Sequence, residues 1–551
     1  MSERTALLNA ITADPDDDAP RLVYADWLDE NCPDRVPSPA AGPSARADYI
    51  RVQCRLAAGA YDDPDYAELL ERERDLIDWL NTHDPDPDPG LDGLIAATLF
   101  PPGGEWGEYR RGFLEEVGFD TYGPAAEETV VTLNEVLQRE LPRTTARTLC
   151  LEDATDEEIA LFACQPVFGR LRGLRLDYLA EGSEDEAVAA VARSARASGL
   201  RRLFLDLPLD TAGFEALAGS RYLGNLESLA MEYPVPAAAL KILGSAKWFR
   251  NLRRLRLWTG GGDHFRALGE LPPMPRLESL SLRGGFEPRP VGAKWFVASD
   301  SFPRLRHLDL DGVHMPPDIV AILARGRWPL RHLNLSGNDL RKAGAEALAA
   351  AKFAPSLQVL ELRNGGITAG GVEALARSEA LAGLRWLELT GNPIGPGGLA
   401  ALARSEPLRG LRVLDLSATN TARAPLAAAD VLAFLTGFAG TELRHLGLND
   451  LPVGVRGARA LAGSPKFANL RRLELSNCSL GERGTAELIG SSVLSGLVYL
   501  SLYRNKVGRG VGKLARPQVL PGLGYVQLGH GIPKGTANRL AKRPGIRFSF
   551  N

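Results

Sequence analysis

Three histidines and two aspartates have the residue types and the spacing that catalysis or metal binding would need. His307, His332 and His445 occupy the same place in a recurring leucine motif, and Asp309 and Asp311 follow His307 at alternate positions. We expect His307 and His332 on neighbouring strands, roughly 5 Å apart. Such groups could bind a metal ion or form a His–Asp dyad. Since no third convergent ligand is apparent, we interpret them as solvent-tolerant strand residues and predict no metal site.

Other motifs for enzyme chemistry are missing from the sequence. It contains no glycine-rich dinucleotide loop after a strand, no Walker loop, no HExxH and no GxSxG. Asp14, Asp16 and Asp18 have the first spacings of a calcium loop, but Ala19 and Ala25 stand where glycine and glutamate are needed. We therefore predict a chain that is not an enzyme, with no catalytic residue and no cofactor.

A stronger pattern is a column of acidic residues. The fifth position of seven consecutive motifs reads Asp309, Asn334, Glu361, Glu388, Asp415, Gly447 and Glu474. The second position is often arginine, as in Arg331, Arg385, Arg412, Arg444 and Arg471. Like charges on adjacent strands lie ~4.8 Å apart, which is unfavourable without compensation. Two interpretations stay open: the charges pair with each other across the sheet, or they form a functional surface.

Aromatic residues occupy the same predicted face. Trp386, Tyr499, Tyr503 and Tyr525 stand at the third or seventh motif position, and exposed Trp and Tyr residues are typical binding anchors. The residues that we predict to bind a partner are Asp309, Glu361, Trp386, Glu388, Asp415, Glu474, Tyr499 and Tyr503.

The elements that carry these residues come from a repeat. The pattern L-x-x-L-x-L recurs from Leu171 to Leu523, mostly every 25 to 28 residues, and weaker copies begin at Leu114 and Ala146. These copies make about sixteen units. The L-x-L part alternates as a strand does, and the second half of many units is rich in the helix formers Ala, Leu and Glu. Each unit therefore predicts a strand, a turn, a helix and a return loop.

This pattern resembles the leucine-rich repeat family, specifically the long type found in ribonuclease inhibitor, over roughly residues 110–551. The resemblance implies an α/β horseshoe solenoid with a parallel sheet inside and helices outside. It also implies that the ninth motif residue ties down the turn after the strand, at Asn338, Asn392, Cys478 and Asn505. The position departs from Asn or Cys at Pro208, Val313, Gly365, Thr419 and Leu451. Cys478 thus has a structural explanation.

The first hundred residues predict a separate small all-α domain. Helices are expected at 6–14, from Pro20 to about 30, at 46–56 and from Pro64 to about 81, with Val23, Tyr24, Trp27 and Leu28 on one apolar face. The string DDDAPRLVYADWL resembles the bacterial repeat-companion domain over about residues 3–58, with an insertion at 33–45. That family implies no established activity. We predict domains at 1–100 and 101–551, with protease cleavage at 33–45 or 84–90.

Composition and charge limit the function classes. The 551 residues are 45% hydrophobic and 24% charged, as in folded proteins, and no apolar run is long enough to span a membrane. Five scattered cysteines without CxxC spacing favour a reducing cytoplasm. Residues 1–100 hold 22 acidic and 8 basic residues, a net of −14, whereas 488–551 hold ten basic and no acidic residues. This asymmetry concerns association rather than fold.

The sequence favours a non-catalytic scaffold that binds a protein partner with a basic surface on the concave solenoid face. One alternative is an enzyme regulator like the Ran GTPase-activating proteins, which have this repeat type. Another is binding of nucleic acid or an anionic surface through the basic C-terminal cap. Head-to-tail self-association through the two charged ends is also possible.

Overall fold

The structure is a computed structural model. It describes residues 3–14, 17–31, 44–59, 65–83, 109–110, 113–114, 116–120, 138, 147–179, 182–259, 263–284, 290–529, 532–543 and 546–550. The chain divides into two compact units. The first comprises Met1–Asn31, Arg46–Tyr61 and Asp86–Asp309, and the second Cys32–Ala45, Asp62–Pro85 and Leu310–Asn551. Most of the 33–45 insertion and all of 84–90 lie outside the described residues. The expected cleavage sites and the boundary at residue 100 therefore stay predictions.

Three helices open the first unit: α1 (Glu3–Ala13), α2 (Ala19–Asn31) and α3 (Ala45–Gly59). Pro20 lies in the first turn of α2, where its missing N–H costs no hydrogen bond. Tyr24 and Leu28 of α2 pack in one core with Ile11 of α1 and Ile50 of α3. The predicted apolar face is wrong at Val23, which is 52% exposed.

The repeats of the first unit form a parallel sheet. Its strands are β3 (Glu116–Asp120), β4 (Thr148–Ala154), β5 (Gly173–Leu179), β6 (Arg202–Asp206), β7 (Ser228–Val235), β8 (Arg254–Thr259), β9 (Ser279–Arg283) and β10 (His307–Asp309). Each pairs in parallel with the next along the chain. The short strands β1 (Tyr109–Arg110) and β2 (Phe113–Leu114) pair separately and antiparallel.

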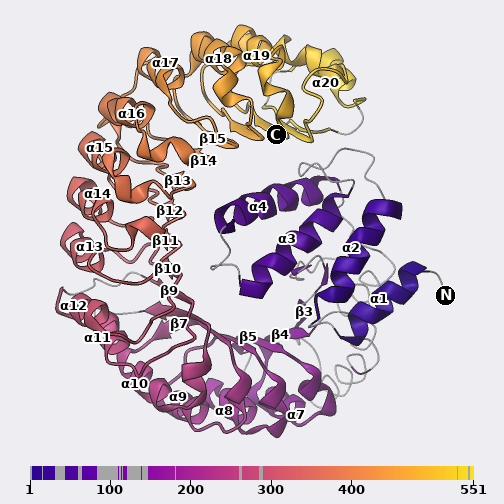
Figure 1. Ribbon diagram of the computed structural model, residues 1–551. Coiled ribbons are helices and arrows are strands. Elements are labelled where there is room, and N and C mark those ends of the chain that lie inside the picture. Colours follow the sequence, from indigo (N-terminus) through magenta and orange to yellow (C-terminus); the bar gives the residue numbers. More distant parts are fainter. Residues whose placement is uncertain are drawn as a thin grey trace. The chain divides into compact units, whose positions relative to one another are not determined.

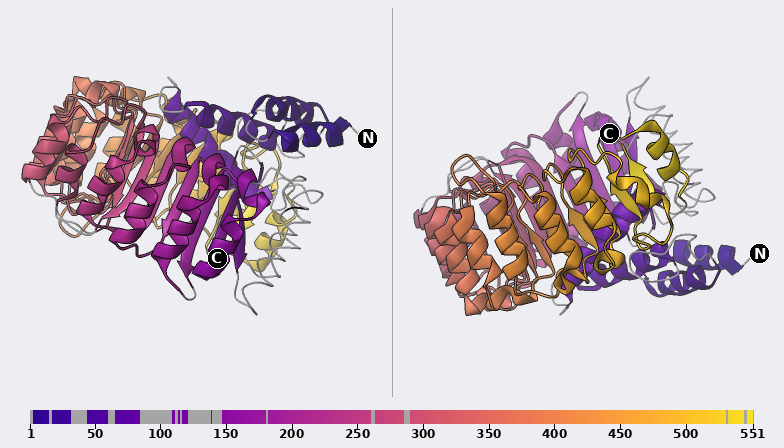
Figure 2. Two further views of the ribbon diagram at one scale, coloured as in Figure 1. Left: turned by 90° about the horizontal axis from the view of Figure 1, so that it is seen from below. Right: turned by 90° about the horizontal axis from the view of Figure 1, so that it is seen from above.

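Helices connect these strands and cover one face of the sheet (Figure 1). They are α7 (Asp156–Ala163), α8 (Glu184–Arg193), α9 (Thr211–Ala218), α10 (Ala237–Ser245), α11 (His264–Gly269) and α12 (Pro290–Ala298). The 3-10 helices are η3 (Pro166–Arg170), η4 (Ala195–Gly199), η5 (Leu223–Asn225) and η6 (Trp248–Asn251). Consecutive α-helices lie side by side, as the left view of Figure 2 shows.

The second unit repeats this arrangement with shorter strands. They are β11 (His332–Asn334), β12 (Val359–Glu361), β13 (Trp386–Glu388), β14 (Val413–Asp415), β15 (His445–Gly447), β16 (Arg472–Glu474), β17 (Tyr499–Ser501), β18 (Tyr525–Gln527) and β19 (Arg547–Ser549). All neighbours in this order are parallel.

The helices of the second unit lie on the outer side of these strands (Figure 1). They are α13 (Pro317–Leu323), α14 (Arg341–Ala349), α15 (Ala369–Arg377), α16 (Gly395–Ala403), α17 (Ala428–Gly437), α18 (Gly454–Gly463), α19 (Gly481–Ile489) and α20 (Lys534–Leu540). The 3-10 helices are η7 (Ala354–Ser356), η8 (Glu379–Leu381), η9 (Pro407–Gly410), η10 (Pro465–Phe467), η11 (Val493–Gly496) and η12 (Gly510–Ala515). One further helix of this unit, α4 (Tyr66–His83), comes from the N-terminal part of the chain.

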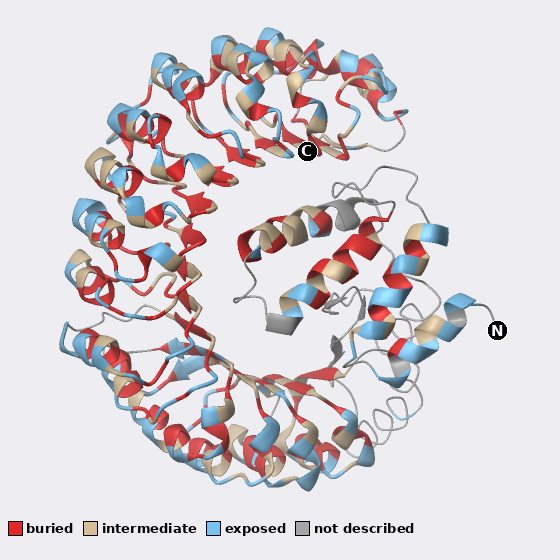
Figure 3. Cartoon of the chain, in the orientation of Figure 1, coloured by how far each residue is buried: buried red, intermediate tan, exposed pale blue. Residues whose placement is uncertain are grey.

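The leucines of the motif form the core between strands and helices. In the unit that contains β12, Leu357, Leu360 and Leu362 are at most 1% exposed. Figure 3 shows the same contrast across the repeats, with buried strands and with helices exposed on their outer side. Every one of the predicted units has its strand, β3 to β18, so the α/β leucine-rich-repeat solenoid with preceding helices is confirmed. The sequence did not predict β19 at the end of the array.

Turn residues hold the strand ends as expected. The Asn392 amide donates to the carbonyl oxygens of Leu362 and Leu389, and its oxygen accepts from the backbone N–H groups of Gly365 and Ile367. Asn338 donates to the oxygens of Leu310 and Leu335 and accepts from the Met315 N–H. Asn505 accepts from the N–H groups of Cys478 and Leu480 and donates to the Leu475 oxygen. Cys478 donates its thiol to the Leu448 oxygen at 3.0 Å, and burial raises the pKa of this thiol to about 12.

Thr419 is one of the departures from the turn position, and its turn is bonded differently. Its hydroxyl donates to the Leu416 oxygen at 2.7 Å. A hydroxyl on a short side chain reaches only this local carbonyl, whereas Asn392 bonds two backbone segments. The expectation of differently bonded turns is therefore correct at this position.

Candidate functional site

The parallel register places the predicted site residues in two columns. In the second unit, Glu361, Glu388 and Asp415 are register partners on β12, β13 and β14. Two residues earlier on each strand lie Val359, Trp386 and Val413, and the column continues to His445, Arg472, Tyr499 and Tyr525. Because alternate strand residues face the same side, both columns project from the sheet face that is turned away from the helices. We call it the inner strand face.

The acidic column is compensated by cations of the same face. Glu361 accepts from His332 at 2.7 Å and from Arg363 at 3.1 Å, and Arg363 also lies 3.3 Å from Glu388. Burial alone would raise the pKa of Glu361, but His332 and Arg363 hold it below its ordinary value. In these contacts the acidic column pairs across the sheet with residues of the third and seventh motif positions, and pairing with the second-position arginines stays a prediction.

Glu388 is less well compensated. Burial raises the pKa of this carboxyl to about 7, and the neighbouring Glu361 charge adds to the effect. The indole N–H of Trp386 donates to one Glu388 oxygen at 3.2 Å. Burial also corrects an expectation, because Trp386 and Glu388 are each only 9% exposed. A tryptophan on this strand face was expected to be an exposed anchor.

Asp309 belongs to the first unit and is also buried, at 7% exposure. It accepts from the Ser281 hydroxyl at 3.0 Å and lies 3.7 Å from Arg283. His307 bonds to the Ser279 hydroxyl at 2.9 Å. Asp309 and His307 therefore both form side-chain hydrogen bonds with serines of β9. These bonds support their interpretation as ordinary strand residues rather than metal ligands.

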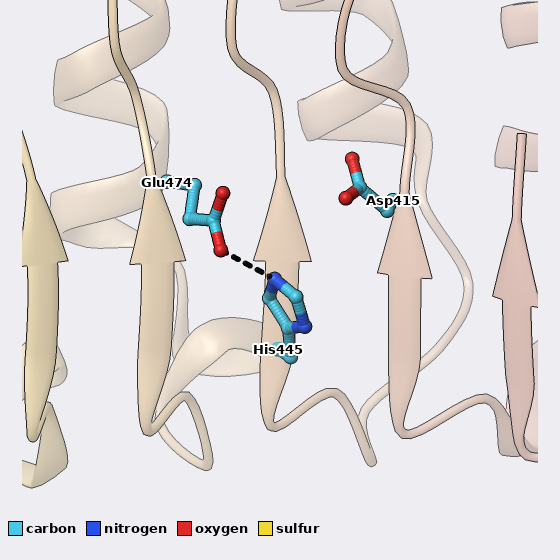
Figure 4. Close-up of side chains that lie close together, drawn as sticks. All are labelled: Asp415, His445 and Glu474. Carbon is cyan, nitrogen blue, oxygen red and sulfur yellow. Dashed lines mark ion pairs between the residues drawn. The ribbon is translucent and has the colours of Figure 1, made fainter. Parts of the chain in front are cut away.

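Asp415, His445 and Glu474 form the tightest cluster of possible metal ligands in the described part of the chain, with one ligand atom of each within 4.8 Å of the others. Figure 4 shows them projecting from three adjacent strands. His445 Nε2 lies 3.3 Å from Glu474 Oε1 as an ion pair. By type, these groups could ligate zinc.

Protein cations already occupy this cluster. Arg472 donates to Glu474 Oε1 at 2.8 Å, and Asn449 donates to Oε2 at 2.8 Å. Although burial alone would raise the pKa of Glu474, the His445 and Arg472 contacts bring it well below its usual range. Burial and the nearby Arg74 charge lower the pKa of His445. A metal ion would have to displace Arg472 from Glu474 and would lie near the Arg74 charge. We therefore interpret Asp415, His445 and Glu474 as part of a network of charged side chains.

The tyrosines at the far end of the column form a stack. The Arg472 guanidinium lies 3.7 Å from the centre of the Tyr499 ring, and Tyr499 stacks on Tyr525 with ring centres 5.2 Å apart. Tyr499 and Tyr503 are both half-buried. These aromatics match the expected binding anchors better than Trp386 does.

Helix α4 lies against the inner strand face of the second unit, which the sequence did not predict. Glu68 of α4 accepts from Arg412 and, at 3.0 Å, from Arg444. The Arg74 guanidinium lies 4.6 Å from the centre of a Trp386 ring. The signal in the sequence is the spacing of Glu68, Glu71 and Arg74, which puts all three on one side of a helix.

The N-terminal end of α4 bonds to the first strands of the same unit. The Tyr66 hydroxyl lies 3.2 Å from His332 Nδ1, and the Ala67 N–H donates to the Gln358 side chain at 3.3 Å. Tyr66 and Ala67 are each 4% exposed. One His332 ring therefore meets Tyr66 through Nδ1 and Glu361 through Nε2.

The basic C-terminal region divides into one structural arginine and nine surface cations. Arg543 is 6% exposed and donates to the oxygens of Leu514, Pro517, Val519 and Leu520. It therefore holds the chain that follows η12 in place. The exposed cations are Arg504, Lys506, Arg509, Lys513, Arg516, Lys534, Arg539, Lys542 and Arg547.

Comparisons with known proteins agree with the repeat fold. The family model described as "Leucine Rich repeat" matches residues 329–349, 353–376 and 384–403. The matched residues carry β11, β12 and β13 with the helices that follow them, and together with the repeated strand–helix units they support a leucine-rich-repeat protein. No curated protein matches the sequence.

Two solved structures have chains similar to this one. A chain of the yeast Rad7 and Elc1 complex is 14% identical, with a TM-score of 0.42 over 77% of this chain and 88% of that chain. An internalin from Listeria monocytogenes is 15% identical, with a TM-score of 0.36 over 76% of this chain and 88% of that chain. Among the described residues, no helix is long and apolar enough to cross a membrane.

Proposed function

We propose that this protein is a non-catalytic scaffold that binds a protein partner on its inner strand face. The carrying observation is the fixed stack of Arg472, Tyr499 and Tyr525 beside Glu474. Aromatic and arginine side chains are the usual anchors of protein interfaces. Anchors that are already held in place lose little side-chain entropy on binding.

The partner residues in this proposal are those that the sequence indicated. Tyr499 and Tyr503 are half-buried and thus partly accessible, and Glu474, Asp415 and Glu361 retain some exposure. Asp309, Trp386 and Glu388 are buried, so they support neighbouring side chains before any partner arrives. A partner with a basic surface fits the carboxylates, and one with apolar side chains fits the tyrosines.

The test is co-purification with the full chain as bait. A Tyr499→Ala/Tyr503→Ala variant should lose most of the protein that the wild type retains, because each lost anchor costs about 1–2 kcal/mol. A matched control is Tyr178→Ala, since Tyr178 is 61% exposed and lies in the first unit. Equal recovery by the double variant and the wild type would refute this surface.

The finer family assignments support the same proposal. The spacing of 25 to 28 residues favours the ribonuclease-inhibitor-like type, and the helices α1, α2 and α3 lie on the residues that resemble the repeat-companion domain. We also propose a cytoplasmic location, which rests on the scattered cysteines.

A second candidate function is contact with nucleic acid or another anionic surface. The observation that favours it is the set of nine exposed cations in the C-terminal region. Nuclease treatment during co-purification separates it from protein binding, because protein partners survive nuclease. The GTPase-activator alternative has less support, since Arg412 and Arg444 are both held by Glu68.

A further inference from the structure

We propose that the inner strand face from β11 to β16 is a helix-binding surface, that α4 is its resident occupant, and that the external partner docks by presenting an acidic amphipathic helix that displaces α4. This inference rests on the proposed function. It adds to the basic surface of the partner an acidic helix, which faces Arg412 and Arg444 rather than the carboxylates of the inner strand face. The residues of α4 that contact the strands show what such a helix must carry.

The first requirement is a carboxylate between two arginines. Glu68 bridges Arg412 and Arg444, which precede β14 and β15. Burial alone would raise the pKa of Glu68, but the two guanidinium groups bring it below its ordinary value. The two arginines occupy the same motif position in adjacent units, so a single carboxylate can bridge both of them.

The second requirement is a cation that covers Trp386. The guanidinium of Arg74 lies on this ring and close enough to Glu361 and His445 to influence their protonation. Glu68 and Arg74 are six residues apart, which is less than two turns of helix. One helix therefore supplies the anion for the arginines and the cation for the acidic column.

The resident helix fits imperfectly, which makes it displaceable. Glu71 is 3% exposed, and its Oε2 has no hydrogen-bond partner; the same holds for Nε and Nη2 of Arg74. Each buried polar atom without a partner costs on the order of 1–3 kcal/mol. A partner helix with a neutral side chain in place of Glu71 would avoid part of this cost.

Space beside the helix points to a more acidic partner. A cavity of about 300 Å³ lies between the start of α4 and the array, next to Glu68, Arg331 and Arg385. Arg385 donates only to backbone oxygens there. Asp65 lines the same cavity, so an additional carboxylate in the partner helix would join Asp65 and Glu68 beside these arginines.

The experiment measures fluorescence anisotropy of a labelled peptide of residues 65–83 with the full chain. A Glu68→Arg chain loosens its own α4, so the peptide should bind it at least ~10-fold more tightly than the wild-type chain, in which α4 competes at high effective concentration. A Glu71→Gln peptide should bind more tightly still. Glu346→Arg, on the exposed face of α14, is the matched control and should bind like the wild type.

Charge reversal tests the contact itself. Arg412→Glu and Arg444→Glu, introduced into the chain that keeps its own Glu68, should release α4, abolish binding of the native peptide and permit binding of a Glu68→Arg peptide. If the native peptide bound equally well with and without these two substitutions, the proposal would be overturned. Equally weak binding of the native peptide to the wild-type and Glu68→Arg chains would also overturn it.

A second measurement needs no folded variant. Excess Glu71→Gln peptide should lower the hydrogen-exchange protection of α4 in the wild-type chain, and unchanged protection would overturn the proposal. If two wild-type chains formed a dimer by exchanging α4, the occupant would be a second copy of this chain, and the proposal of an external partner would be wrong. If the peptide does not bind but the Tyr499→Ala/Tyr503→Ala variant loses its partner, only this inference is wrong. If the peptide binds as expected but the variant keeps its partner, only the proposed function is wrong.

Discussion

Glu71 shows how burial changes the chemistry of one residue. Burial raises the pKa of this carboxyl to about 8, the Asp75 charge raises it further, and Arg444, Arg74 and Arg412 oppose the rise. Its ordinary value is 4.5. Because the docked form binds the proton more tightly than the released form, docking of α4 is fully favoured at low pH and weakens as the pH rises towards 8.

We predict that α4 loses hydrogen-exchange protection between pH 6.5 and 8, after correction for the intrinsic exchange rate, and that the loss levels off above pH 8. The loss should be at least ~10-fold, since each pKa unit corresponds to about 1.4 kcal/mol. Glu388, with a pKa of about 7, titrates in the same range, and the comparison with the Glu71→Gln chain separates the two carboxyls. Glu68, Glu361 and Glu474 have lowered pKa values and stay ionised throughout.

The Glu71→Gln chain should keep its protection across the same range, because the amide does not titrate. Glu346→Gln on α14 is the control and should behave as the wild type. If Glu71→Gln lost protection as steeply as the wild type, another group would have to carry the pH dependence.

At the scale of elements, the turn after each strand depends on a buried amide. Asn392 is completely buried, and it bonds two carbonyl oxygens and two N–H groups of the backbone on adjacent units. An amide side chain supplies two N–H donors and an acceptor oxygen at once, so it can bond several backbone groups at such a position. The turn therefore links neighbouring repeats as well as ending its own strand.

We predict that Asn392→Ala lowers the free energy of unfolding by about 3 kcal/mol, since several buried backbone groups lose their partner. Urea denaturation followed by circular dichroism measures the change. Asn469→Ala is the matched control, because Asn469 bonds a single carbonyl at the surface, and it should cost less than about 1 kcal/mol. Equal midpoints for the two variants would contradict the role of the turn amide.

At the scale of the whole molecule, charge is distributed towards the two ends of the sequence. Residues 1–100 carry a net of −14, while the C-terminal region exposes nine cations and buries only Arg543. Arg543 bonds the Leu514 carbonyl within η12 and the carbonyls of Pro517, Val519 and Leu520 after it, and these bonds do not involve the other nine cations. Their charge remains available for association.

We predict oligomers at low salt whose size falls on addition of 1 M NaCl, where screening shortens to ~3 Å. Light scattering measures this, and Lys534→Glu/Arg539→Glu/Lys542→Glu should reduce the low-salt oligomer. A chain that stays monomeric at both salt concentrations and shows no salt-sensitive retention on a nucleic-acid column would leave the basic region as a simple cap.

The repeated part of the fold could be predicted from the sequence because its determinants are local. The spacing of Leu357, Leu360 and Leu362 sets both the strand and the buried face, and each neighbouring unit repeats it. The turn role of Asn392 and Cys478 follows from the same register. The order of the acidic column is fixed too, because parallel pairing aligns equivalent residues.

Only the tertiary structure decided which of these side chains are accessible. Trp386 and Glu388 have the strand position of exposed residues, yet α4, more than three hundred residues away in the sequence, brings Arg74 onto Trp386. The Glu68 contacts with Arg412 and Arg444 have the same origin. Repeat spacing carries no information on a contact between non-repeating and repeating segments, because that contact depends on how the intervening chain places the helix.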